Sequence, residues 1–109
     1  MTKITVTKKN NEIVELECDG HTDYGVHGED IVCSALSSIV QTAVLGLMMV
    51  AGINVSLKRD ENRGYLKLTL PQNVSPEARH DANVILNTMM CGISDLREGF
   101  SDFIELEVK

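Results

Sequence analysis

A histidine and a cysteine, His21 and Cys33, lie on either side of a glycine-containing stretch of the chain. A free thiol has a reference pKa of about 8.5, so it is mostly protonated at neutral pH, although the thiolate is the reactive form. A helix N-terminus and a nearby imidazolium both lower the pKa of a thiol. If the chain brings both to Cys33, this residue is a candidate nucleophile and His21 is its candidate base.

Asp30 precedes a run of apolar residues at helical spacing and predicts a helix N-cap. Its carboxylate would then accept the amide of Val32 or Cys33, which places Cys33 in the first helical turn. Amides at this helix start could also hold an oxyanion. Asp30 has a second candidate role, which is to orient the His21 imidazole; we favour the cap, and both roles stay open.

Ser37 lies one helical turn beyond Cys33, on the same face of the expected helix. Its hydroxyl could line the same pocket, or its small size could simply allow another segment to approach closely. Both interpretations stay open.

Gly20, Gly25 and Gly28 bracket the stretch between His21 and the expected helix. Glycine adopts backbone conformations that other residues avoid, so these positions would let the chain fold back toward the helix start. We therefore predict a flexible loop that closes over a substrate. His27, in the same stretch, is expected to be an exposed loop residue.

The segment from Gly20 to Ser38 reads GHTDYGVHGEDIVCSALSS and resembles the signature of the ribosomal-processing cysteine proteases, the Prp family. The resemblance covers the whole chain in length and element order. It implies a catalytic dyad of His21 and Cys33, accompanied by Asp30 and Ser37. It also implies a bacterial enzyme, homodimeric, that removes a short N-terminal extension from large-subunit ribosomal protein twenty-seven.

Two other kinds of function are compatible with these residues. His21, His27, Asp30 and Cys33 are all possible zinc ligands, but their spacing matches no common zinc motif, so we expect neither a metal nor another cofactor. A non-enzymatic, ribosome-associated assembly module would also fit a small acidic chain. Replacing Cys33 would distinguish such a module from an enzyme, because only the enzyme needs the thiol.

The chain has 109 residues, of which 43% are hydrophobic, and this predicts one domain spanning 1–109. Its net charge of −6 argues against direct binding to nucleic acid. This charge suits a basic partner, but it is also ordinary for a cytosolic protein, and we favour the ordinary explanation. The N-terminal residues alternate without the apolar run of a signal peptide, and residues 43–51 are shorter than the roughly 18–20 residues of a membrane helix. The three cysteines form no C-x-x-C pair, which is typical of reduced thiols. We expect a cytoplasmic protein with no membrane partner.

The hydrophobic pattern predicts the element order ββαββαβ. Two hairpins are expected in residues 4–18 and 55–70, two helices in 30–52 and 75–99, and a last strand in 104–108. These elements give an α+β fold, in which a single sheet is built from the two hairpins and the C-terminal strand and both helices pack on one of its faces.

Three expectations concern burial. The end of the first helix is apolar all round, so we expect it to be buried on every side, and in a chain this short it also suggests a homodimer. Cys18 and Cys91 are expected to be packing residues rather than nucleophiles. His80 is expected on the polar face of the second helix.

Overall fold

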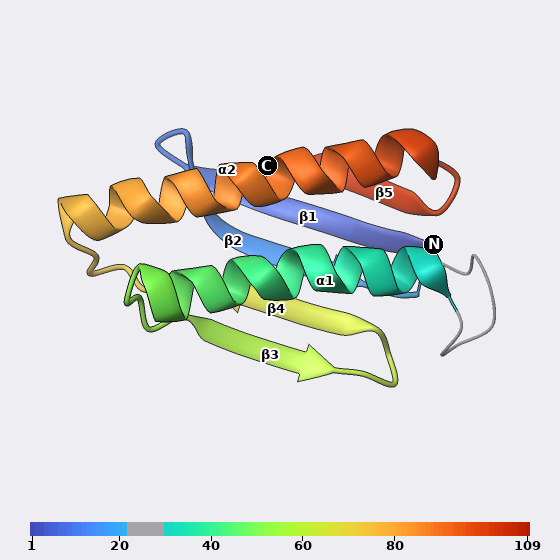
Figure 1. The fold of residues 1–109 in the computed structure, drawn as a ribbon, viewed down its shortest axis with the longest axis horizontal. Coiled ribbons are helices and arrows are strands. Elements are labelled where there is room, and N and C mark those ends of the chain that lie inside the picture. Colours follow the sequence, from blue (N-terminus) through green and yellow to red (C-terminus); the bar gives the residue numbers. More distant parts are fainter. Residues whose placement is uncertain (22–29) are drawn as a thin grey trace.

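The computed structural model describes residues 1–21 and 30–109, and two helices cover one face of a five-stranded sheet in it (Figure 1). The elements follow the chain as β1 (Thr2–Lys9), β2 (Glu12–Asp19), α1 (Ile31–Leu45), the π-helical segment η1 (Gly46–Val50), β3 (Ser56–Asp60), β4 (Tyr65–Thr69), α2 (Pro76–Gly99) and β5 (Ile104–Val108). The predicted α+β class, the order ββαββαβ and the single sheet are confirmed.

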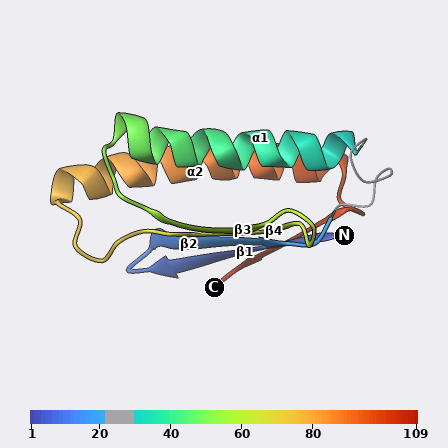
Figure 2. The same cartoon turned by 90° about the horizontal axis from the view of Figure 1, so that it is seen from below.

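The strands lie in the order β3-β4-β2-β1-β5, and every neighbouring pair is antiparallel except β1 and β5, which are parallel. Figure 2 shows both helices on the same side of the sheet. Alternate residues of each central strand therefore face the helices, as Val6, Leu16 and Leu68 do in adjacent register positions. This places the core between the sheet and the two helices.

The two helices run side by side above the sheet (Figures 1 and 2), and a glycine on each lies against an isoleucine of the other. A Cβ added at Gly92 would lie 3.2 Å from Cγ2 of Ile39, and one added at Gly46 would lie 3.6 Å from Cγ2 of Ile85. A side chain at Gly92 would therefore require Ile39 to give way by a few tenths of an ångström. Close packing of this kind fixes the position of α1 over the sheet.

The far end of the first helix is exposed, so the expectation that it is buried on every side is wrong for the single chain. Met49 is 78% and Val50 is 84% exposed, and Leu45 and Met48 are also about half exposed, whereas Leu47 is fully buried. A helix that lies on one face of a sheet buries only one stripe of its surface. The remaining apolar side chains at this end consequently face solvent.

Cys91 also differs from its expected place, because its side chain is exposed while Met89, two residues earlier, is buried. Two residues correspond to about 200° around an α-helix, which puts Cys91 on the opposite side of α2. The prediction of a packing role holds for Cys18, which is buried, and fails for Cys91. His80 is exposed, as expected for the polar face of this helix.

In the part of the chain that the structure describes, the stretch Ile31–Val50 is long and apolar enough to cross a membrane, judged by length and composition alone, with a hydropathy of 1.9. The expectation that the chain has no membrane helix rested on residues 43–51, which form a shorter stretch. About a third of it, 33%, is buried inside the protein, along the stripe that faces the sheet and α2. A core helix of a soluble protein passes the same test.

Replacing Leu86 by alanine should lower the free energy of unfolding by about 3 kcal/mol, because its side chain is only 1% exposed and the change leaves a cavity in the core. Val84, on the same helix, is 53% exposed and provides the matched control. Val84→Ala should change stability by no more than about 0.5 kcal/mol. Urea unfolding at one fixed protein concentration measures both, and equal losses would contradict this description of the core.

Candidate active site

The start of α1 is fixed by Asp30, which is extended (φ −74°, ψ 105°) and only 5% exposed. Its Oδ1 accepts hydrogen bonds from the amides of Val32 and Cys33, both at 3.0 Å. These bonds give the buried carboxylate two donors and satisfy two amides that have no partner within the helix. The predicted cap is confirmed, and Cys33 lies half-buried in the first turn of α1.

The same bonds bear on where an oxyanion could be held. The amides of Val32 and Cys33 already donate to the carboxylate of Asp30, and the amide of Ser34 donates to the Asp30 carbonyl at 3.1 Å. To hold an oxyanion, as the sequence suggested for helix-start amides, these three would have to leave or share their present acceptors. The reason is the N-cap, because the Asp30 carboxylate accepts hydrogen bonds from the amides that were expected to be donors.

His21 follows β2 through Gly20, whose backbone adopts a φ of +94°. A Cβ added at Gly20 would lie 2.8 Å from the carbonyl oxygen of Met1, and the hydroxyl of Thr2 donates to the Gly20 carbonyl oxygen at 3.0 Å. Both the conformation and the space therefore demand glycine here.

The prediction of a flexible loop rested on Gly20 together with Gly25 and Gly28. The structure accounts for Gly20 by the local backbone geometry at the end of β2. Gly25, Gly28 and His27 lie in 22–29, outside the described residues.

The turn between β3 and β4 lies against the imidazole of His21. Nε2 of His21 is 3.2 Å from the carbonyl oxygen of Asn62. Gly64, at φ +69°, comes so close that a Cβ there would lie 2.8 Å from the carbonyl oxygen of Gly20 and 3.1 Å from Cε1 of His21. This turn forms one wall around the histidine.

A cleft of about 580 Å³ brings the predicted site residues together, because His21, Asp30, Cys33 and Ser37 all line it. It lies between α1 and the β3–β4 end of the sheet, and its other walls include Gln41, Arg59 and Leu66. The hydroxyl of Ser37 accepts a hydrogen bond from Nε2 of Gln41 at 2.7 Å. Of the two interpretations of Ser37, its place on the cleft wall favours the pocket-lining one.

Cys18 lines the same cleft, but its thiol is buried at the end of β2. Burial, with a smaller contribution from Glu17, raises the pKa of Cys18 to about 12. The thiol is therefore protonated at neutral pH and is a poor nucleophile. Of the two cysteines in the cleft, Cys33 is the better candidate.

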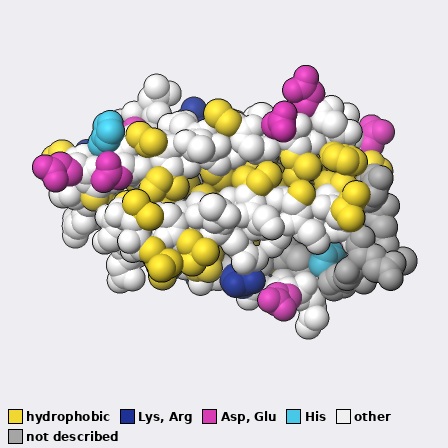
Figure 3. Space-filling model, in the orientation of Figure 1, with side chains coloured by type: hydrophobic (Ala, Val, Ile, Leu, Met, Phe, Trp, Pro, Cys, Tyr) yellow, Lys and Arg dark blue, Asp and Glu magenta, His cyan; other side chains and the backbone are white. Residues whose placement is uncertain are grey.

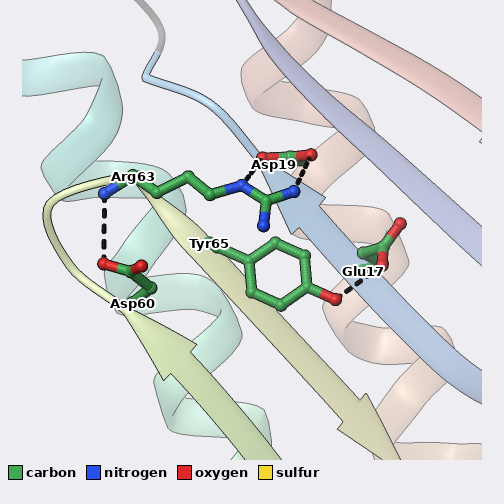
Figure 4. Close-up of polar contacts among 5 residues, drawn as sticks. All are labelled: Glu17, Asp19, Asp60, Arg63 and Tyr65. Carbon is green, nitrogen blue, oxygen red and sulfur yellow. Dashed lines mark hydrogen bonds and ion pairs between the residues drawn. The ribbon is translucent and has the colours of Figure 1, made fainter.

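A cluster of polar side chains lies where the β3–β4 turn meets the end of β2 (Figure 4). Arg63 donates from Nε and Nη2 to the two carboxylate oxygens of Asp19, at 3.2 and 2.9 Å, and this partner raises the pKa of Arg63. The guanidinium also lies 4.4 Å from the ring centroid of Tyr65, whose hydroxyl donates to Glu17 at 2.7 Å. No local pattern in the sequence indicates this cluster, since the contacts join residues more than forty positions apart.

Within residues 1–21 and 30–109, no three His, Cys, Asp or Glu side chains are grouped so that they could hold a metal ion. The zinc alternative also involved His27, which the structure does not describe.

A family model for the cysteine protease Prp matches residues 1–105. The chain belongs to this family. The chain is therefore a cysteine protease. The exposed Cys91 lies outside the described lining of the cleft.

Individual Prp proteins match over nearly the whole chain. The ribosomal processing cysteine protease Prp of Bacillus subtilis (strain 168) is 27% identical over 103 residues, which cover 94% of this chain and 92% of that protein. The essential ribosomal processing protease Prp from S. aureus, in complex with a covalently linked product peptide, has a TM-score of 0.88 at 24% identity and full coverage of both chains. The same protease with a substrate peptide has a TM-score of 0.84 at 22% identity, again with 100% coverage of each. The fold is thus that of Prp proteins solved with peptides.

Asp30→Ala should lower the free energy of unfolding by about 1 kcal/mol, because two helix-start amides lose their acceptor. Asp30→Asn is the matched variant and should retain the stability, since asparagine caps a helix about as well as aspartate. Urea unfolding measures both variants. Equal destabilisation by the two would mean that the charge, rather than the cap, stabilises the helix start.

Proposed function

We propose that this protein is a cytoplasmic endopeptidase that removes the short N-terminal extension of large-subunit ribosomal protein twenty-seven, with Cys33 as nucleophile and His21 as base. The observation that carries the proposal is the single cleft that His21 shares with Cys33 at the capped start of α1. Relatives of the chain are named ribosomal processing proteases, and the extension of protein twenty-seven is the substrate implied by the family signature.

The first half of the reaction forms a thioester. His21 takes the proton of the Cys33 thiol, and the thiolate adds to the scissile carbonyl carbon, whose oxygen becomes an oxyanion. When this intermediate collapses, the C–N bond breaks and the His21 imidazolium gives its proton to the leaving amine. The Cys33 thiol lies in the first turn of α1, at the positive end of the helix dipole.

The second half releases the new carboxyl terminus. His21, neutral again, takes a proton from a water molecule as this water attacks the thioester carbonyl. The C–S bond then breaks, and the Cys33 sulfur leaves as a thiolate that recovers its proton from His21. Both halves use the same two side chains, so the cleft needs no cofactor for this chemistry.

The substrate assigned here is a protein rather than a nucleic acid or a membrane. The net charge of −6 favours a basic polypeptide, because phosphate binding depends on clustered lysine and arginine. The stretch Ile31–Val50, although apolar, contributes its buried stripe to the protein core. A cytoplasmic location fits three cysteines without disulfide pairing in the described residues.

We also propose that the protein is a homodimer, and that the second copy covers the exposed end of the first helix. Leu45, Met48, Met49 and Val50 form an apolar surface there, and Figure 3 shows hydrophobic side chains gathered over the helical face of the molecule. Exposed apolar clusters of this kind are typical of protein interfaces. A chain of this size has little interior in which to bury them by itself.

Incubation with the extended ribosomal protein should yield one shortened product with the wild-type protein and none with Cys33→Ala or His21→Ala. Mass spectrometry of the products checks this and locates the cut. Cys91→Ala is the control, because Cys91 is exposed on α2 and lies outside the described lining of the cleft, and it should cleave at the wild-type rate. Binding without cleavage by both wild-type and Cys33→Ala proteins would instead support the assembly module.

Light scattering at micromolar concentration should give the mass of a dimer for the wild-type protein and that of a monomer for Met49→Glu. A buried carboxylate at the interface is expected to cost more than the apolar contact contributes. Val108→Glu provides the control, because Val108 is an exposed apolar residue on β5, at the opposite edge of the sheet from β3. A monomeric wild-type protein would contradict the dimer.

A further inference from the structure

The contact between His21 and Asn62 indicates which ring nitrogen carries the proton. A backbone carbonyl oxygen can only accept a hydrogen bond, so Nε2 of His21, 3.2 Å from the Asn62 carbonyl oxygen, is the donor. A neutral imidazole has one N–H, and the other nitrogen is then the base. In the neutral ring this leaves Nδ1 unprotonated.

We propose that the β3–β4 turn positions the catalytic histidine: the Asn62 carbonyl fixes the tautomer and plane of the ring, and the ion pair of Asp19 and Arg63 holds this carbonyl in place. Nδ1 is then the atom that exchanges a proton with Cys33. This inference rests on the proposed function in one respect, namely that His21 is the base of the protease. Asp19 and Arg63 are positioning residues, since they act through the turn.

The ion pair can hold the turn because it joins the two segments that must keep their relative position. Asp19 is the last residue of β2, two positions before His21, whereas Arg63 follows Asn62 in the turn. The two parallel hydrogen bonds of the guanidinium restrain both the distance and the orientation of Arg63 (Figure 4). The pair therefore ties the residue after Asn62 to the strand end two residues before His21.

Two further contacts restrain the same turn. The amide of Arg63 donates to Oδ1 of Asp60 at 3.3 Å, and the guanidinium lies over the ring of Tyr65. Gly64 brings the backbone of the turn against Gly20 and the edge of the imidazole, so the ring is confined on this side as well as hydrogen-bonded. The turn therefore restrains the ring through both a hydrogen bond and direct packing.

Kinetics of a peptide containing the N-terminal extension test the ion pair in the full-length protein. Asp19→Asn and Arg63→Gln should each lower kcat about 2- to 5-fold with a smaller change in KM, because losing an exposed pair displaces the histidine in part of the population while peptide contacts remain. The double variant should be no slower than the slower single variant, since both break one pair. Arg63→Lys should be intermediate, because lysine keeps the charge and loses the two-bond geometry.

Lys67→Gln is the matched control. It breaks another ion pair, between Lys67 on β4 and Glu15 on β2 at 3.6 Å, which does not involve the turn. Its kcat should equal that of the wild type. Urea midpoints should be nearly the same for all these variants, because exposed ion pairs contribute little to stability. Wild-type kcat in Asp19→Asn and Arg63→Gln, or equal losses in Lys67→Gln, would overturn the inference.

The tautomer is measured without any substrate. Nitrogen NMR of labelled Cys33→Ala, at a pH where His21 is neutral, should show Nε2 protonated and Nδ1 unprotonated, and Arg63→Gln in this background should give a mixture of tautomers. A proton on Nδ1 would overturn the inference even if the wild-type protein cleaves. If the wild-type protein cleaves no ribosomal peptide, the proposed function fails, and the tautomer and its dependence on Arg63 still decide this inference.

Discussion

The two hydrogen bonds from the amides of Val32 and Cys33 to Asp30 determine where α1 begins, and the site depends on that point. They place the thiol in the first turn, at the positive end of the helix dipole. They also use the amides that a substrate oxyanion would otherwise meet at the helix start. The cap thus fixes the turn that carries the thiol and engages the amides nearest to it.

Tertiary contacts within the described chain help to position His21. Thr2 from β1 holds the carbonyl of Gly20, and the β3–β4 turn brings Asn62 and Gly64 against the ring. Helix, strand end and turn therefore meet only in the folded sheet. Packing of α1 on α2 and on the sheet keeps the cap in register with the histidine.

The parts of this arrangement that the sequence predicts are those with a local cause. Asp30 before an apolar helical run and Ser75-Pro76 before the second helix are signals that act within one turn, and the strands follow from alternation. Local patterns could not predict that Cys91 is exposed, or that the apolar end of the first helix near Val50 is exposed. Apolar composition indicates what a side chain prefers, whereas exposure depends on which stripe of the helix the sheet covers.

The β3–β4 turn shows why part of a site cannot be predicted from the sequence. Its hydrogen bond to His21 comes from a backbone carbonyl, which almost any residue supplies, so the side chain of Asn62 carries no signal. What the sequence must provide is indirect: a glycine at position 64, where φ is positive and no side chain fits, and a charge pair that joins the turn to β2. Each has an ordinary structural explanation when considered alone. Only their common contact with the end of β2 connects them to the histidine.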